Sequence, residues 1–457
     1  MCGPNLLEGF NPRLGNNAES SSPPPLEDVA NLRLDRYRLQ FQARNLLLNV
    51  GQKQVDEGTL KHKQNIHKTA KCLFTRHSQH AVIKKSIEHE KAFYAGLVVC
   101  ASVWSCPVCA AKIQERRRIE VAKGFDWAYE NDKKVVMVTF TFPHYVWQKL
   151  NDLLAMQQDA YRRLRSGKAW TNKKQKIGYT GLIRSLELTI GSKGWHPHTH
   201  EAWIVDKDVD ADELQAWLTE RWLNCCNSAG IVVNNVDAFR KRAVDIVDNA
   251  RSSAYLAKQD SSKNWGADRE LVKGSSKVGK HPFSLLNKSY EGDKKASAQF
   301  LEYVFAMRGK PQLFWSKGLK DLVGVTELTD EILASQKEDK ATDIAKLTAR
   351  DWAAVMIAPR DARANLLDLA ENGGKAAVME YLRPLKRAFK IWEAKKAQEA
   401  DEAKQKEINK RNSDRDFGYP VPSESNSYKE LLNDLVVKLT VQSEIVLDNF
   451  ISSRIIR

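Results

Sequence analysis

The stretch RSLELTIGSKGWHPHTHEAWIV, residues 184–205, decides the fold that we expect. Its two halves alternate apolar and polar residues on either side of GSKG, which is typical of an antiparallel hairpin. If Ser192 and Lys193 form a two-residue loop, Glu187 lies directly opposite His198. Directly opposed residues project from the same face of a sheet, so the carboxylate and the imidazole should lie together.

Three histidines of this hairpin, His196, His198 and His200, recur at every second position. Successive side chains of a strand point to opposite faces, so the three imidazoles share a face and suit a divalent metal. A chance cluster of surface histidines is the alternative. Pro197 cannot donate to a sheet ladder, so the strand can begin there, and His196 is the weaker ligand candidate. A carboxylate beside two imidazoles favours Mg²⁺ or Mn²⁺, unless Glu187 is merely a solvated strand residue.

The composition of the chain points to a polyanionic partner. It has 457 residues, of which 42% are hydrophobic and 28% charged, enough for several globular domains. Its net charge is +15. The blocks 61–120, 161–190 and 251–320 carry +8, +7 and +8 and contain tryptophans. Such blocks suit a phosphate-binding track, although solvated charged faces are the alternative. No apolar run is long enough for a membrane span and no secretory leader is visible, so we expect no membrane association.

The cysteines predict a structural zinc site. Cys100, Cys106 and Cys109 have the spacing of a zinc knuckle, with CPVC at its centre. Cys72 is the natural fourth ligand, with His77 and His80 as alternatives. The alternative to a zinc site is a set of buried free thiols. Basic residues after this knuckle and elsewhere are candidate DNA contacts. They are Arg116, Arg117, Arg118, Lys173, Lys174 and Lys280. Lys280 belongs to GSSKVGKH (274–281), which nearly matches a phosphate-binding P-loop but has His281 in place of serine or threonine, so a DNA-contact loop is favoured.

Residues 245–259 have a helix-like pattern, in which Tyr255 and Lys258 are three residues apart and share a face. A tyrosine phenol can attack phosphorus when a metal polarises the phosphate. Most tyrosines are packing residues, so this feature is weak when taken alone.

Three segments in order, VTFTFPH (138–144), GWHPHTHEAWIV (194–205) and AYLAKQ (254–259), resemble the three motifs of the HUH endonucleases. More closely, the chain resembles the plasmid rolling-circle replication initiator (Rep) family of the single-tyrosine type. The segment AMRGKPQLFWSKGLKDLVGV (306–325) is similar to one typical of that family. The resemblance implies an α+β fold with an HUH-type central antiparallel sheet flanked by helices. The metal histidines would lie on a middle strand and the tyrosine on a facing helix.

The resemblance also implies a reaction: metal-dependent tyrosine transesterification that nicks one strand at the double-strand origin and leaves a 5′-phosphotyrosine and a 3′-OH primer. The metal, Mg²⁺ or Mn²⁺, would be held by Glu187, His198 and His200, and Tyr255 would be the nucleophile. Implied partners are double- and single-stranded origin DNA, host helicase and host DNA polymerase in the bacterial cytoplasm; an oligomer is compatible with this. Family members often carry a glutamate one helical turn before the tyrosine, where this chain has Arg251 and Ser252.

Two further residues are candidates within this picture. His144 either lines the site or caps a strand. Asp248, seven residues before Tyr255, either replaces the missing glutamate or is a solvated helix residue. The competing functions are a relaxase or single-strand transposase of the HUH class, and a non-catalytic zinc-finger DNA-binding regulator.

We expect the following organisation along the chain. It comprises a disordered N-terminus (1–30), a helix plus zinc-binding DNA-contact module (31–120), the HUH endonuclease domain (134–325), a helical region (330–411), a linker (412–427) and a C-terminal helix (428–457).

Overall fold

The structure is a computed structural model that describes residues 26–61, 66–248, 280–335 and 340–413. The chain divides into two compact units, which are described separately. One unit comprises residues 1–70 and 99–336, and the other comprises residues 71–98 and 337–457.

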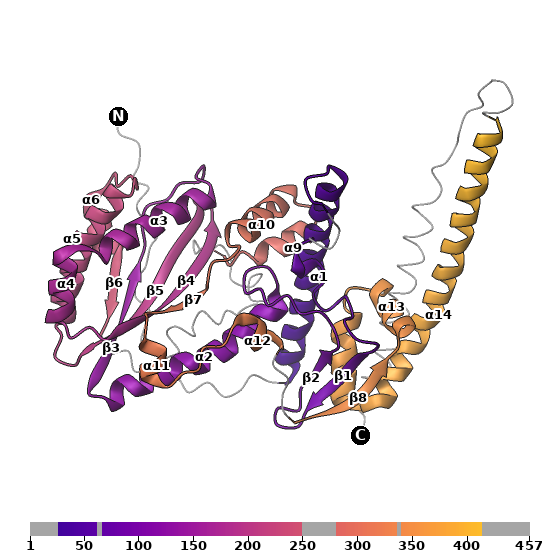
Figure 1. Cartoon of the computed structure of the whole chain (residues 1–457), viewed down its shortest axis with the longest axis horizontal. Coiled ribbons are helices and arrows are strands. Elements are labelled where there is room, and N and C mark those ends of the chain that lie inside the picture. Colours follow the sequence, from indigo (N-terminus) through magenta and orange to yellow (C-terminus); the bar gives the residue numbers. More distant parts are fainter. Residues whose placement is uncertain (1–25, 62–65, 249–279, 336–339, 414–457) are drawn as a thin grey trace. The chain divides into compact units, whose positions relative to one another are not determined.

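The first unit is built around a five-stranded sheet with the order β6-β3-β5-β4-β7 (Figure 1). Its strands are β3 (Lys133–Phe140), β4 (Gly181–Gly191), β5 (Gly194–Asp206), β6 (Val244–Val247) and β7 (Leu313–Trp315). Every neighbouring pair is antiparallel, and β5, which carries the histidines, is the middle strand. The expectation of a central antiparallel sheet with the histidines at its centre is therefore confirmed.

The β4–β5 hairpin has the register predicted from its two-residue loop. Gly191 pairs with Gly194 and Glu187 pairs with His198. Gly194 has a φ of 90°, which L-residues rarely adopt, and a Cβ there would lie 2.9 Å from the Cα of Val146. Glycine is therefore required at the end of this turn.

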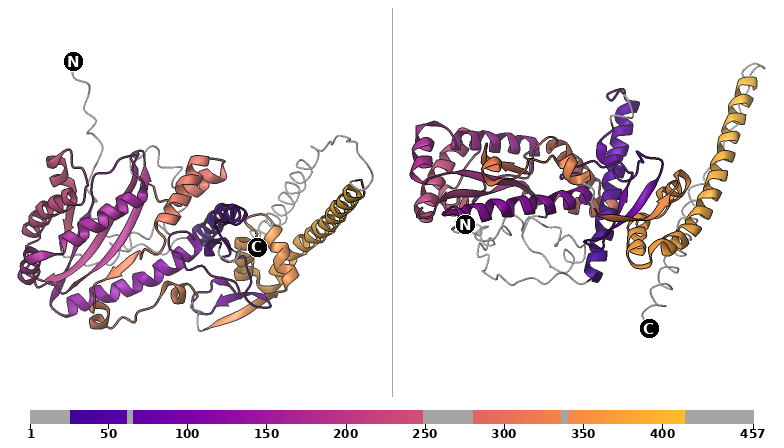
Figure 2. Two further views of the ribbon diagram at one scale, coloured as in Figure 1. Left: turned by 45° about the horizontal axis from the view of Figure 1, so that its top comes forward. Right: turned by 60° about the horizontal axis from the view of Figure 1, so that its bottom comes forward.

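Helices cover both faces of the sheet, which makes the unit α+β; the right-hand view of Figure 2 shows the sheet between α2 and α3. On one face, Val121 and Phe125 of α2 (Pro107–Glu130) pack with Ala202 and Ile204 of β5. On the other face, Phe140 contacts aromatic rings of α3 (Leu150–Leu164) and α5 (Ala211–Ser228). The histidines continue the α2 face of β5 beyond Ala202, because 196, 198, 200 and 202 alternate with the residues that face α3.

The remaining helices of this unit are short apart from the first. They are α1 (Leu26–Asp56), η2 (Lys68–Ala70), α4 (Gly167–Lys176), α6 (Val236–Arg242), α9 (Ser284–Tyr290), α10 (Lys294–Ala306), α11 (Leu319–Val323) and α12 (Asp330–Ser335). The helix expected at the start of the 31–120 module is present as α1. The helix expected over 245–259 is wrong where the structure describes it. Residues 245–247 belong to β6, which pairs with β3, and the preceding Val244 is buried.

The second unit has a three-stranded antiparallel sheet with the order β2-β1-β8 and two C-terminal helices. Its elements are β1 (Ala81–Ser86), β2 (Ala92–Ala95), β8 (Ala341–Leu347), α13 (Ala349–Ile357) and α14 (Ala362–Ser413). The expectation that 330–411 is wholly helical is wrong at β8, where Ala345 and Leu347 are buried against β1. Gly374 interrupts α14 with φ 60° and ψ −152°.

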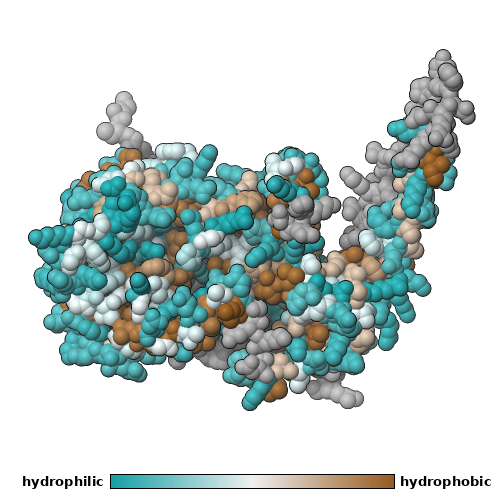
Figure 3. Space-filling view, in the orientation of Figure 1, coloured by the Kyte–Doolittle hydropathy of each residue, from teal (hydrophilic) through white to brown (hydrophobic). Residues whose placement is uncertain are grey.

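Several expectations lie outside the described residues. These are residues 1–25 of the N-terminus, residues 414–427 of the linker and the helix at 428–457. The expected disorder over 1–30 is wrong at 26–30, which belong to α1, and the expected linker over 412–427 is wrong at 412–413, which belong to α14. Among the helices of the described ranges, none is both long and apolar enough to cross a bilayer. Hydrophilic residues cover most of the visible surface over the sheet of the first unit (Figure 3).

Candidate metal centre

The carboxylate of Glu187 on β4 lies between two imidazoles of β5. The Nε2 atoms of His198 and His200 are each 3.2 Å from Oε2 of Glu187. One ligand atom from each residue lies within 4.8 Å of the others, and all three side chains are partly exposed. This is the group that the hairpin register predicts, and solvent can reach it.

The outer nitrogens of both imidazoles are held by neighbouring groups. Nδ1 of His198 lies 3.4 Å from the backbone carbonyl of His196, to which it can only donate. Nδ1 of His200 lies 3.0 Å from the hydroxyl of Thr139 on β3. Because Nδ1 is engaged in each ring, Nε2 is directed toward Glu187 and is the nitrogen available to a metal. One carboxylate oxygen and two imidazole nitrogens fit a divalent cation.

The Glu187 carboxyl is ionised at neutral pH. Burial raises its pKa, but hydrogen bonds from His198 and His200 and their electrostatic effect lower it further, so that the pKa lies below the usual glutamate range. The site therefore offers a negative charge to a bound cation.

His196 is set apart from this group. Its Nε2 lies 2.6 Å from the hydroxyl of Thr141, and its ring stacks on His144 with centroids 4.6 Å apart. Burial, with smaller effects of His198 and His144, lowers the pKa of His196 to about 3, and burial also lowers the pKa of His144. Both rings are neutral, and the weaker ligand candidate of the sequence is a neighbour of the cluster rather than a member. His144 lies beside the histidine row.

His281, which was not among the site residues predicted from the sequence, follows a residue that pairs with the hairpin. The backbone of Lys280 exchanges two 2.8 Å hydrogen bonds with Ile190 at the end of β4, which places the chain next to the hairpin. Burial lowers the pKa of the following residue, His281, to about 3, against an opposing effect of the Glu187 carboxylate. The only feature of the sequence that singles out His281 is its position in GSSKVGKH (274–281), where a P-loop has serine or threonine.

The reverse face of β5 carries a buried polar cluster. Glu201 is fully buried, forms an ion pair with Arg165 at the end of α3, and accepts a 2.7 Å hydrogen bond from Nε1 of Trp203. The hydroxyls of Tyr161 and Thr199 are hydrogen-bonded to each other, and burial raises the pKa of Tyr161. These contacts fix the strand directly behind His198 and His200.

The four predicted cysteines also come together. The Sγ atoms of Cys72, Cys100, Cys106 and Cys109 lie within 4.8 Å of one another, and all four residues are buried. Cys106 is the N-cap residue of α2, followed by Pro107, so the helix begins at the knuckle. Such a cluster can hold a metal such as zinc.

The comparisons with known proteins decide the family. The family model described as "Replication protein" matches residues 94–353, more than half of the chain, and this range includes the candidate metal centre. The chain belongs to the plasmid replication protein family. It is 27% identical over 361 residues to "Protein rep" of Streptomyces lividans, covering 63% of this chain and 79% of that protein.

A second relative of this plasmid replication protein is the "Neomycin resistance protein" of Streptomyces cyanogenus. The two chains are 32% identical over 142 residues, which is 24% of this chain and 31% of the relative. No solved structure matches this chain.

Tyr255 and Lys258 of this replication protein lie outside the described residues. Asp248 follows strand β6 and forms a 2.7 Å ion pair with Lys134. The two-turn spacing from Asp248 to Tyr255 lies outside the described residues, so the role of Asp248 as a candidate base stays a prediction.

Some of the predicted DNA contacts have protein partners. Arg117 donates to Glu120 (2.7 Å), the Leu328 carbonyl (2.8 Å) and Asp330 (3.0 Å). Lys173 is buried and pairs with Glu213 at 3.1 Å. Both contribute to the packing of the protein in this arrangement, and their role in DNA binding stays a prediction.

The other basic candidates vary in exposure. Arg116 donates to the Leu333 carbonyl, Arg118 pairs with Glu115, and Lys174 lies over the Tyr179 ring. Arg118, Lys174 and Lys280 are exposed, and their role in DNA binding stays a prediction.

Proposed function

We propose that this protein starts plasmid rolling-circle replication by nicking one strand of origin DNA through metal-dependent tyrosine transesterification. The observation that carries the proposal is the position of Glu187 between His198 and His200 on the central hairpin. The match to the replication protein family supports a role in plasmid replication, and the order of the three sequence motifs supports tyrosine transesterification.

Glu187, His198 and His200 would hold Mg²⁺ or Mn²⁺. When bound, such an ion polarises a phosphate and stabilises charge that develops on its oxygens. Thr139 and the His196 carbonyl keep the two imidazoles oriented, and the Arg165–Glu201 cluster holds the strand behind them.

Tyr255 supplies the nucleophile in this proposal. Its phenol oxygen forms a bond to phosphorus, the bond from phosphorus to the 3′ oxygen breaks, and the phenol gives up its proton as the 3′ oxygen gains one. The products are a 5′-phosphotyrosine and a free 3′-OH. Lys258, three residues on, would place a positive charge near the phenol and the phosphate.

The free 3′-OH would prime host DNA polymerase while host helicase unwinds the plasmid, as the family resemblance implies for a protein of the bacterial cytoplasm. The cysteine cluster would hold Zn²⁺ as a structural ion near the start of α2. Zinc held there would fix the entry of α2, whose C-terminal half packs under the sheet.

A covalent-adduct assay tests the proposal. Labelled single-stranded oligonucleotides that tile the plasmid are incubated with the full chain and Mn²⁺, then run on a denaturing gel. We expect one oligonucleotide to give a protein-sized labelled band that is absent with Tyr255→Phe and with EDTA. A non-catalytic DNA-binding regulator would bind DNA without such a band, and that result would refute the nicking function.

A further inference from the structure

Helix α1 buries a glutamine in the stripe of residues that packs against α2 and α9. Tyr37, Gln40, Ala43 and Leu47 follow one another at intervals of three or four residues, which is the spacing of one helix face. All four are buried, and Gln40 is 0% exposed. Glutamine is mostly exposed in proteins, and burial of its amide costs free energy unless the amide is hydrogen-bonded. The position of Gln40 therefore calls for a polar partner inside the protein.

A sulfur of the cysteine cluster is such a partner. The side-chain amide of Gln40 donates to Sγ of Cys106 over 3.8 Å. The sulfur of a neutral thiol accepts hydrogen bonds weakly, whereas hydrogen bonds to an ionised group are roughly twice as strong as those between neutral groups. A cysteine must be deprotonated to bind a metal. A bound metal would therefore turn the weak contact between Gln40 and Cys106 into a strong one.

The charge of a zinc-loaded cluster gives this contact its importance. Four thiolates around one Zn²⁺ leave an excess of negative charge, and all four cysteines are buried. Buried charge is costly unless nearby dipoles or opposite charges compensate it. The start of α2 supplies such dipoles, because Cys106 is its N-cap residue and Cys109 lies in its first turn, where the helix dipole favours negative charge. The amide of Gln40 supplies another dipole, from α1.

The loop that joins Cys100 to Cys106 is held by contacts that do not involve sulfur. The hydroxyl of Ser105 lies 2.6 Å from that of Thr69 and donates to that of Ser102 at 2.7 Å. Thr69 and Ser105 are both buried. This network should fix the shape of the loop whichever residue α1 presents to it.

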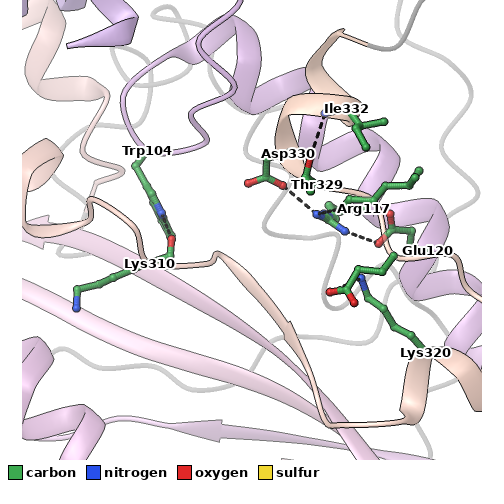
Figure 4. A network of polar contacts seen from close by, with 10 residues as sticks. Trp104, Arg117, Glu120, Lys310, Lys320, Thr329, Asp330 and Ile332 are labelled. Carbon is green, nitrogen blue, oxygen red and sulfur yellow. Dashed lines mark hydrogen bonds and ion pairs between the residues drawn. The ribbon is translucent and has the colours of Figure 1, made fainter. Parts of the chain in front are cut away.

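Figure 4 shows two further anchors of this region. Nε1 of Trp104, in the same loop, donates to the carbonyl of Lys310 at 2.6 Å. Farther along α2, Arg117 donates to Glu120 at 2.7 Å and to Asp330 at 3.0 Å. The loop and α2 therefore have anchors of their own, and the amide on α1 is directed at the sulfur.

We propose that Gln40 is the hydrogen-bond donor to the zinc-bound thiolate of Cys106, so that α1 strengthens the hold of the cluster on zinc. The proposal rests on the zinc binding proposed above and does not depend on nicking. An N–H donor draws electron density from the thiolate and orients its lone pairs. Partners that touch a metal ligand rather than the metal typically change metal affinity about 10–100-fold. Gln40 is thus a positioning residue for the metal, contributed from 66 residues before the ligand that it contacts.

The test compares three variants of the full chain with the parent. Gln40→Met keeps the length of the side chain and removes its N–H donors. Gln40→Glu keeps the shape and places a carboxylate beside the sulfur. The matched control is Gln42→Met, which removes an amide of the same helix that donates to the hydroxyl of Ser289 at 2.8 Å.

Two quantities are measured. The first is zinc affinity, from competition with EDTA and the zinc that stays on the protein. The second is the absorption spectrum of the Co²⁺-substituted protein, whose thiolate-to-cobalt charge-transfer bands report the electron density on sulfur. We expect Gln40→Met to weaken zinc binding about tenfold or more and to move these bands to longer wavelength. Gln40→Glu should weaken zinc binding further, because its charge repels the thiolate. Gln42→Met should match the parent in both measurements.

Unchanged affinity and an unchanged cobalt spectrum in Gln40→Met would overturn the proposal. Weaker zinc binding without a band shift, or equal losses in Gln40→Met and Gln42→Met, would assign the effect to the packing of α1 and would also overturn it. The spectrum is recorded on the cobalt-loaded fraction, so a less stable variant still gives a result. Parent protein that binds neither zinc nor cobalt would refute the structural ion itself, whereas Gln40 variants that match a metal-loaded parent would refute only the role of Gln40.

Discussion

Glu187 and His198 face each other across the β4–β5 hairpin, with Oε2 3.2 Å from Nε2. A two-residue turn fixes this pairing, and a shift of one residue would move the carboxylate to the opposite face of the sheet. The candidate metal centre therefore depends on the hairpin register, in which Gly191 pairs with Gly194 and Gly194 adopts the positive φ of the turn.

The first prediction concerns the group that orients His200. Thr139→Val removes the hydroxyl 3.0 Å from Nδ1 of His200 while keeping the side-chain shape. Loss of such a partner typically lowers metal affinity about 10–100-fold, which Mn²⁺ titration calorimetry can measure. Thr141→Val is the matched control, because its hydroxyl contacts His196. Unchanged affinity in Thr139→Val, or an equal loss in both variants, would contradict this role.

The second prediction concerns zinc. Protein purified without chelator should contain one zinc per chain, measured by atomic emission. Cys106→Ser should lose the metal and unfold at a lower temperature, since structural zinc contributes directly to folding. Cys225→Ser, which changes a buried thiol of α5 outside the cluster, should keep its zinc. Parent protein without zinc would disprove the prediction.

A third prediction tests the buried ion pair behind the histidines. Glu201→Gln leaves Arg165 without its charged partner in a buried setting. Breaking such a pair costs about 3–5 kcal/mol of the free energy of unfolding, measurable by urea denaturation. Lys207→Met removes an exposed pair with Asp132 and should leave the urea midpoint unchanged. The prediction fails if the two variants have the same midpoint.

The fourth prediction is a pH dependence in the second unit. Burial raises the pKa of Asp351, but hydrogen bonds from Lys386 and Thr348 outweigh it, so the pKa lies below the usual value of about 3.9. A depressed carboxyl pKa stabilises the folded state above that value, and this stabilisation is lost as pH falls below it. Asp351→Asn should therefore lower the melting temperature at pH 7 and by less at pH 3.

The control for this prediction is Asp401→Asn, which changes an exposed carboxylate of α14. It should shift the melting temperature little at either pH. A difference between parent and Asp351→Asn that stays constant from pH 7 to pH 3 would contradict the assigned role of Asp351.

The part of the fold that the sequence predicts is the part with strong local patterning. The alternation in residues 184–205 and the glycines at the turn determine the hairpin, its register and the Glu187, His198 and His200 group. The spacing of the cysteines similarly predicts their cluster. In each case the contacts are between residues close in sequence or repeat a known ligand spacing.

The elements that the sequence does not predict depend on contacts between distant segments of the chain. Strand β8 pairs with β1, about 260 residues earlier, so no local pattern distinguishes it from the helices that follow. β6 has only four residues and forms by adding to the edge of β3. Lys280 pairs with Ile190 at the end of β4, a contact between distant segments that the sequence alone does not reveal.

The most direct test of the central claim is the identity of the residue joined to DNA. The covalent adduct is formed with the full chain and Mn²⁺, the DNA is trimmed with nuclease, and the peptides are sequenced by mass spectrometry. The account predicts a 5′-nucleotide attached to the phenol oxygen of Tyr255. Attachment to any other residue, or protein that nicks without a covalent intermediate, would contradict it.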